Sequence, residues 1–220
     1  MTLPTAILFD WDNTLVDGWE AIMRGLNATF AAHDMPAWTR DDVLRNVRRS
    51  LKDSFPDLFG NRWEAARDIF YKEVRACHLD VLAALPGTAE MLDAAGAVAP
   101  LSVVSNKQGH LLRAEATHLV WNGYFETLVG AGDARADKPD AAPLLLALER
   151  MRLPPGPQVW YVGDTVLDMQ AARAAGCSAV LIGEAEHDGG VAAAAPDAAF
   201  MNASALRAHL VSLDRRPISG

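Results

Sequence analysis

The sequence predicts an α/β protein in which helices flank a parallel sheet and an all-helical segment is inserted after the first strand. Three observations support this. Short apolar runs rich in β-branched residues recur along the chain, helical patterns alternate with them from residue 86 onward, and residues 17–85 carry helical patterns alone. Buried strands that alternate with helices are typical of parallel sheets covered on both faces.

The expected strands are too short for helices and end at small or polar residues. They cover residues 5–10, 100–105, 127–130, 158–163 and 178–183. Apolar residues at helical spacing predict helices within residues 88–95, 108–118, 141–151 and 167–175.

The segment 17–85 contains no predicted strand, and its apolar spacing predicts three or four helices. We therefore expect two domains, a core of residues 1–16 and 86–220 and a helical domain of residues 17–85. A total length of 220 residues accords with that division. Most of the net charge of −8 lies in the core segments, because the insertion is nearly neutral.

Composition narrows the classes of partner. A net charge of −8 argues against nucleic acid and against anionic membrane surfaces. Two cysteines, Cys77 and Cys177, form no disulfide framework and fit a reducing compartment. The N-terminus shows no targeting signal, and no apolar run reaches membrane-spanning length. We expect a cytoplasmic monomer or homodimer that does not bind membranes.

Two carboxylates follow the first predicted strand, at Asp10 and Asp12, with Thr14 two residues further on. Ligands of open α/β sheets bind beyond the carboxyl ends of the strands. Carboxylates so close repel unless a cation lies between them or one is protonated. Asp10 as a nucleophile toward phosphorus and Asp12 as a proton donor would use both, with Thr14 holding a phosphoryl oxygen. An Asp-rich turn is the competing interpretation.

Two further groups suit an anion. Ser105 ends the second predicted strand and Asn106 follows it, ahead of a helix whose first N–H groups could bind an anion. Lys138 precedes Pro139 and another predicted helix. Its ammonium at this position could neutralise the charge of a bound phosphate or a phosphoaspartate. Taken singly, each has a plainer interpretation, a helix cap for the first pair and a solvated lysine for the second.

Asp164 and Asp168 follow the fourth predicted strand. A helix beginning there places both on one face, and with Asp10 they supply ligands for a hard cation. Mg²⁺ takes one or two carboxylates together with water and substrate phosphate. A helix cap with an acidic first turn competes with this interpretation, chiefly for Asp168.

Together these groups resemble the four motifs of the haloacid dehalogenase superfamily of phosphohydrolases, namely Asp-x-Asp-x-Thr, Ser, Lys-Pro and Gly-Asp-x-x-x-Asp. The resemblance covers nearly the whole chain and is closest to the phosphoglycolate phosphatase group, whose helical C1-type cap lies between the first two motifs. Trp11 stands where leucine is common in that group, and Asn13 where glycine is commoner. The resemblance implies a Rossmann-like catalytic core and a cap domain.

The resemblance also implies roles for individual residues. Asp10 would form an aspartyl-phosphate, and Asp12 would act as general acid and then as base. The phosphoryl group would be bound by Thr14, Ser105, Asn106 and Lys138. Mg²⁺ would be held by Asp10, Asp12, Asp164 and Asp168, with Asp12 contributing its main-chain carbonyl. The expected substrate is a small phosphorylated metabolite, with phosphoglycolate as one candidate.

Specificity is expected to come from the cap. Arg49 and Lys52 lie where the phosphoglycolate phosphatases carry a specificity stretch, and we hypothesise that one of them reaches the leaving group. The solvated face of an amphipathic helix is the competing interpretation for both.

Two alternative functions fit part of the pattern. A phosphomutase of the same superfamily keeps both acids of the first motif. A phospho-accepting signalling or binding protein would also use an aspartate, a hydroxyl and a lysine around Mg²⁺, without turnover. Such a receiver carries its acceptor on a later strand and lacks a 69-residue helical insertion like residues 17–85, so an enzyme is the better prediction.

Overall fold

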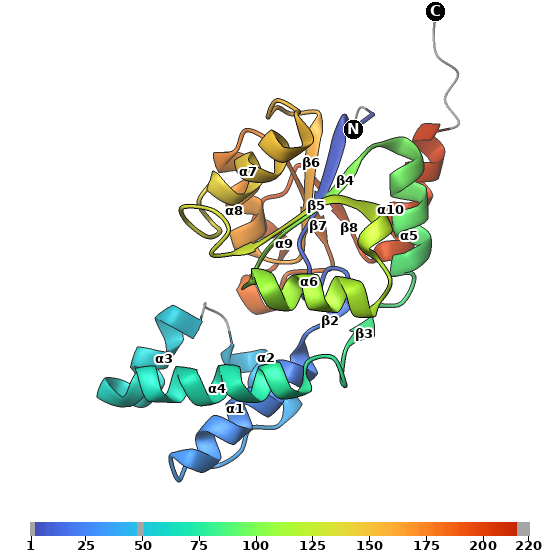
Figure 1. Cartoon of the computed structure of the whole chain (residues 1–220). Helices are drawn as coiled ribbons and strands as arrows, with labels where there is room; N and C mark the ends of the chain where they lie inside the picture. The colour runs from blue at the N-terminus through green and yellow to red at the C-terminus, as the bar shows by residue number, and fades with distance from the viewer. Residues whose placement is uncertain (1–2, 48–50, 215–220) are drawn as a thin grey trace, which may run out of the picture. The chain divides into compact units, whose positions relative to one another are not determined.

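The structure of the protein is a computed structural model that describes residues 3–47 and 51–214. The chain divides into two compact units, one formed by the segments up to Val16 and from Ala84 onward, the other by Asp17–Ala83. The predicted α/β class is confirmed, because the first unit is a parallel sheet flanked by helices (Figure 1).

The sheet has six strands in the order β5-β4-β1-β6-β7-β8, and all paired neighbours run parallel. The strands are β1 (Ala6–Phe9), β4 (Leu101–Gln108), β5 (Phe125–Ala131), β6 (Val159–Gly163), β7 (Ser178–Ile182) and β8 (Ala198–Phe200). Phe9 at the end of β1 pairs with Val103 on one side and Val162 on the other. The polar residues that follow β1 and β6 therefore meet at one edge.

Helices cover both faces of this sheet. They are α5 (Thr88–Val98), α6 (Gly109–His118), α7 (Ala142–Met151), α8 (Val166–Ala174), α9 (Gly190–Ala194) and α10 (Ala203–Asp214), with short 3-10 helices at Asn122–Tyr124 and Glu186–Asp188. Helices α7 and α8 pack against one face, and α5 and α10 pack together on the other (Figure 1). On the α7–α8 face, Leu8, Tyr161 and Leu181 join the helix residues Leu144 and Met169 in one buried cluster.

The second unit contains four α-helices within its described residues. They are α1 (Trp19–Ala32), α2 (Arg40–Asn46), α3 (Leu51–Phe59) and α4 (Trp63–Cys77), with a 3-10 helix at Gly60–Arg62. Its core is aromatic, because the Phe55 ring lies 5.0 Å from Phe59 and 5.6 Å from Phe70. Thr39 begins α2 with a reciprocal capping box to Asp42.

Several elements differ from the sequence prediction. The two-residue strands β2 (Val16–Asp17) and β3 (Ala83–Ala84) pair with each other, so the expectation of no strand within 17–85 was wrong at both ends of that segment. The edge strand β8 and the helices α9 and α10 were also not predicted. Runs of two or three residues are too short to show the alternation that marks a strand.

No helix among the described residues combines the length and the apolarity that a membrane span requires.

Gly25 provides a test of packing in the helical unit. A Cβ at this position would lie 2.8 Å from the Phe70 ring and 2.8 Å from Val74 Cγ2, both on α4. Overpacking costs about 1–3 kcal/mol, whereas alanine gains up to about 1 kcal/mol over glycine in a helix. We expect Gly25→Ala to lower the free energy of unfolding, measured by chemical denaturation followed by circular dichroism.

Gly96 in α5 is the matched control. A Cβ there meets only Leu101 Cδ1, at an ordinary 3.9 Å. Gly96→Ala should therefore raise stability by about 0.5–1 kcal/mol through helix propensity alone. Equal stabilisation by both substitutions would contradict the packing argument at Gly25.

Candidate active site

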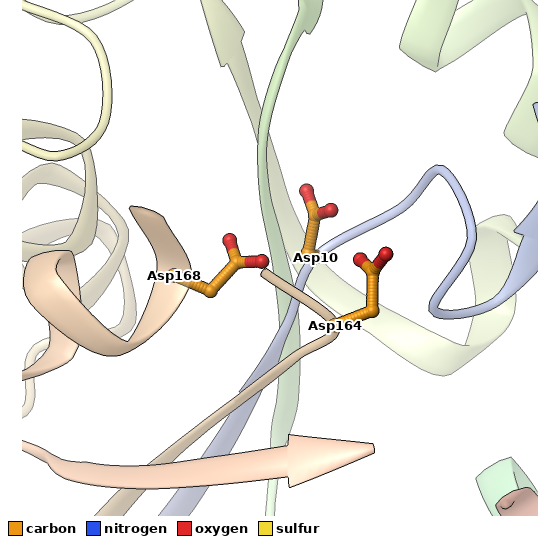
Figure 2. Close-up of side chains that lie close together, drawn as sticks. All are labelled: Asp10, Asp164 and Asp168. Atoms are coloured by element: carbon orange, nitrogen blue, oxygen red, sulfur yellow. The ribbon is translucent and has the colours of Figure 1, made fainter. Parts of the chain in front are cut away.

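Three carboxylates meet where β1 and β6 end. Asp10 follows the last residue of β1, Asp164 follows the last residue of β6, and Asp168 lies in the first turn of α8. One oxygen from each lies within 4.8 Å of the others, and Figure 2 shows the side chains gathered at the end of β1. The cluster that the sequence predicts from two distant motifs therefore forms in the fold.

Local backbone geometry places Asp168. Thr165 and Asp168 form a capping box at the start of α8, in which Thr165 N–H and Oγ1 donate to Asp168 Oδ2 at 3.0 and 2.6 Å. A Cβ at Gly163 would overlap the Asp168 carboxyl group, so glycine is required by this close approach. Asp168 is thus both the helix-cap residue and a member of the acidic cluster.

Lys138 lies at the centre of the cluster. Its ammonium donates to Asp10 Oδ1 and to Asp168 Oδ1, both at 2.7 Å, and its side chain is only 4% exposed. It also donates to Tyr161 Oη at 2.9 Å, and that hydroxyl in turn donates to the Val104 carbonyl at 2.7 Å. Tyr161 was not predicted, because a tyrosine within an apolar strand run gives no signal of its polar end.

Asn106 holds the Lys138 segment. Its Nδ2 donates to the Lys138 carbonyl at 3.0 Å, and its Oδ1 accepts from the Lys138 N–H at 2.9 Å. Ser105 Oγ accepts from the Lys107 N–H at 3.2 Å, within the irregular last part of β4. Ser105 and Asn106 therefore bind the backbone of Lys107 and Lys138.

Burial and like charges perturb the acids. Burial raises the pKa of Asp10 to about 6; Asp168 adds to the rise, and Lys138 opposes it. The Asp164 pKa is raised well above 3.8 by desolvation and then by Asp168 and Asp10. Thr14 Oγ1 donates to Asp164 Oδ1 at 3.1 Å and favours the ionised form.

The residues fit a divalent cation. Three carboxylates face the single ammonium of Lys138, which leaves an excess negative charge when all are ionised. Hard oxygen ligands so arranged are those that Mg²⁺ takes. Asp12, predicted to contribute its main-chain carbonyl, is not among the three clustered side chains.

The loop after β1 turns Asp12 toward another lysine. Asn13 has φ 62°, a left-handed conformation that asparagine tolerates better than most residues. Asp12 Oδ1 lies 2.8 Å from Lys107 Nζ, which in turn binds Glu115. The sequence motif contained Lys107 but suggested no role for it, and Glu115 gave no signal.

The cap residues proposed for specificity are not tested. Arg49 lies outside the described residues, and the Lys52 side chain also lies outside them.

The electrostatic argument predicts how stability depends on pH. Without divalent cations, a carboxyl whose folded pKa exceeds its unfolded value of 3.8 stabilises the fold at low pH. That contribution is lost as pH rises toward the folded pKa. We expect Asp164→Asn to unfold at higher denaturant than the wild type at about pH 8. The difference is reduced by solvent screening because Asp164 is half-buried, and it should shrink toward pH 4.

Saturating Mg²⁺ should make the wild type more stable than Asp164→Asn, the reverse of the order expected without Mg²⁺. Wild type gains about 2.7 kcal/mol at a hundredfold excess over Kd, and the variant, which lacks one ligand, gains less. The same denaturation curves with and without Mg²⁺ measure both effects. An equal gain in the two proteins would rule out Asp164 as a ligand.

Comparison with known proteins agrees with this geometry. The family model described as haloacid dehalogenase-like hydrolase matches residues 7–182. A phosphoglycolate phosphatase of Xylella fastidiosa is 34% identical over 180 residues, which cover 79% of this chain and 77% of the relative. A second phosphoglycolate phosphatase, from Chromobacterium violaceum, is 29% identical over 188 residues, covering 81% and 84%.

Solved structures of haloacid dehalogenase-like proteins are also similar to this chain. A haloacid dehalogenase superfamily hydrolase from Ehrlichia chaffeensis is 26% identical with a TM-score of 0.66, covering 97% of this chain and 98% of that one. A haloacid dehalogenase-like protein from Streptococcus pneumoniae, 24% identical, shares the fold with a TM-score of 0.85, covering 95% and 99%. The chain therefore belongs to the haloacid dehalogenase-like hydrolase family and is an enzyme of its phosphatase class.

Proposed function

We propose that the protein is a Mg²⁺-dependent phosphomonoesterase that works through an aspartyl-phosphate on Asp10. The observation that carries this proposal is the placement of Asp10 against Lys138, within the acidic cluster at the sheet edge. A nucleophilic carboxylate, a fixed ammonium and ligands for a cation are the parts that phosphoryl transfer requires.

In the first step, an Asp10 oxygen attacks phosphorus as the bond to the leaving oxygen breaks. Asp12, two residues on in the same loop, donates a proton to that oxygen. In the second step, Asp12 takes a proton from water, whose oxygen attacks phosphorus and releases phosphate and Asp10. Two carboxylates with different lysine partners suit these two roles.

Lys138 holds the nucleophile and offsets negative charge as it develops on the phosphoryl oxygens. Thr14 and Ser105 are assigned to the phosphoryl oxygens, while Asn106 orients the segment that carries Lys138. Bound Mg²⁺, held by Asp10, Asp164 and Asp168 side chains and the Asp12 carbonyl, would supply charge neutralisation for an anionic substrate.

The proposed substrate is a small phosphorylated metabolite. The relatives named as phosphoglycolate phosphatases make phosphoglycolate the first compound to test. A cytoplasmic site of action is part of the proposal and accords with two free, buried cysteines. A phosphomutase is the alternative within the family. It would transfer the phosphoryl group from Asp10 to a second position of the substrate instead of to water.

Asp10→Asn tests the central step. The amide keeps the size of the side chain but cannot attack phosphorus, so turnover of p-nitrophenyl phosphate with Mg²⁺ should fall by about 10³-fold or more. Release of inorganic phosphate over many turnovers is the measurement, with circular dichroism as the check on folding. A folded variant that keeps its Mg²⁺-dependent activity would contradict the assignment of Asp10 as the nucleophile.

A screen of phosphorylated metabolites separates the remaining alternatives. Multiple turnovers with stoichiometric release of phosphate are expected. A single phosphorylation per chain without turnover would favour a signalling protein, and transfer to a second position of the substrate would favour a mutase.

A further inference from the structure

A second charge cluster, fully buried at Glu115 and partly exposed at Asp12 and Lys107, contains the proposed proton donor. It consists of Trp11, Asp12, Lys107 and Glu115, all within the sheet unit. Lys107 comes from the end of β4, and Glu115 from the middle of α6. None of the sequence motifs of the family resemblance assigns a role to Lys107 or Glu115.

Glu115 stands where an apolar side chain would ordinarily pack. It follows Leu111 by one helical turn, on the same buried face of α6 as Leu112 and Ala116, and it is fully buried. A buried carboxylate is costly unless other groups satisfy it. The indole N–H of Trp11 donates to Glu115 Oε2 at 2.6 Å, and Lys107 supplies the positive charge.

Lys107 is fixed by this carboxylate. Its ammonium donates to both Glu115 oxygens, at 2.7 and 2.6 Å, and lies 2.8 Å from Asp12 Oδ1. Because its charge is already balanced by two carboxylates, Lys107 is poorly suited to binding a substrate anion.

We propose that Glu115 and Lys107 are positioning residues that hold Asp12 in place for proton transfer to the leaving group. The ammonium binds Oδ1 of Asp12, so Oδ2 is the oxygen assigned to the proton. Trp11, the neighbour of Asp12 in the chain, anchors the same glutamate and so links the loop to α6. This inference rests on the proposed function, in which Asp12 is the general acid.

The inference predicts a dependence on the leaving group. An alkoxide needs a proton as it departs, whereas p-nitrophenolate is stable without one. Loss of positioning should therefore slow phosphoryl transfer from an alkyl phosphate much more than from p-nitrophenyl phosphate. The quantity to compare is kcat/KM, because it reports the steps up to transfer onto Asp10.

The experiment measures kcat/KM for glycerol phosphate and p-nitrophenyl phosphate at saturating Mg²⁺. For Glu115→Gln and Lys107→Met we expect the alkyl value to fall about 10-fold or more, and the aryl value to change less than about 3-fold. Asp12→Asn sets the reference for complete loss of the proton donor. Arg113→Gln, which removes an exposed ion pair of α6 with Asp133, should change neither value.

Lys107→Met leaves Glu115 buried without its cation and risks misfolding. The double variant Lys107→Met with Glu115→Leu removes the whole pair and should show the same preference for the aryl ester. Circular dichroism confirms that each variant is folded.

The outcomes separate the two proposals. If Asp12→Asn spares the aryl ester but the folded Glu115 and Lys107 variants lower both substrates equally, the positioning role is overturned while the proposed function stands. If Asp12→Asn itself shows no preference between the esters, Asp12 is not the acid and both proposals fail at that residue.

Discussion

The ion pairs of Lys138 hold the site together. Three carboxylates at one sheet edge repel each other, and the single ammonium that bridges Asp10 and Asp168 offsets part of that repulsion. Burial and repulsion keep the pKa of Asp10 and of Asp164 raised. The negative charge of such a site exceeds its positive charge. A bound cation would balance the excess and allow an anionic substrate to bind beside it.

The sheet topology makes this arrangement possible. Because β1 and β6 are neighbours in the sheet, Asp10 and Asp164, which follow these two strands, meet at one edge, and Lys138 reaches Asp10 from the segment after β5. Two local features accommodate Asp168. Residue 163 is a glycine, which leaves space for the Asp168 carboxyl group, and the capping box at the start of α8 uses that same carboxylate. The position of Asp168 is therefore set by local backbone features.

Sequence reasoning reached the parts of the site that follow local rules. Asp10 and Asp164 were predictable because each directly follows an apolar run, and the carboxyl ends of parallel strands share an edge. Tyr161 and Glu115 were not predictable, because each lies among apolar residues whose pattern indicates ordinary core and gives no sign of a polar partner. The sequence allowed Asp168 to be either part of a helix cap or a metal ligand. In the structure it belongs to the capping box and also to the acidic cluster. Strands β3 and β8 are too short to carry a pattern.

The loop after β1 places two carboxylates close together, and two lysines balance their charges. Asp10 and Asp12 are two residues apart, and carboxylates so close repel each other unless cations offset their charges. In the fold they face different cations, Asp10 with Lys138 and Asp12 with Lys107. Lys138 is shared with Asp168 of the acidic cluster, whereas Lys107 is shared with Glu115, away from it. Pairing each acid separately gives the two carboxylates distinct environments, which is the condition for one to attack while the other transfers a proton.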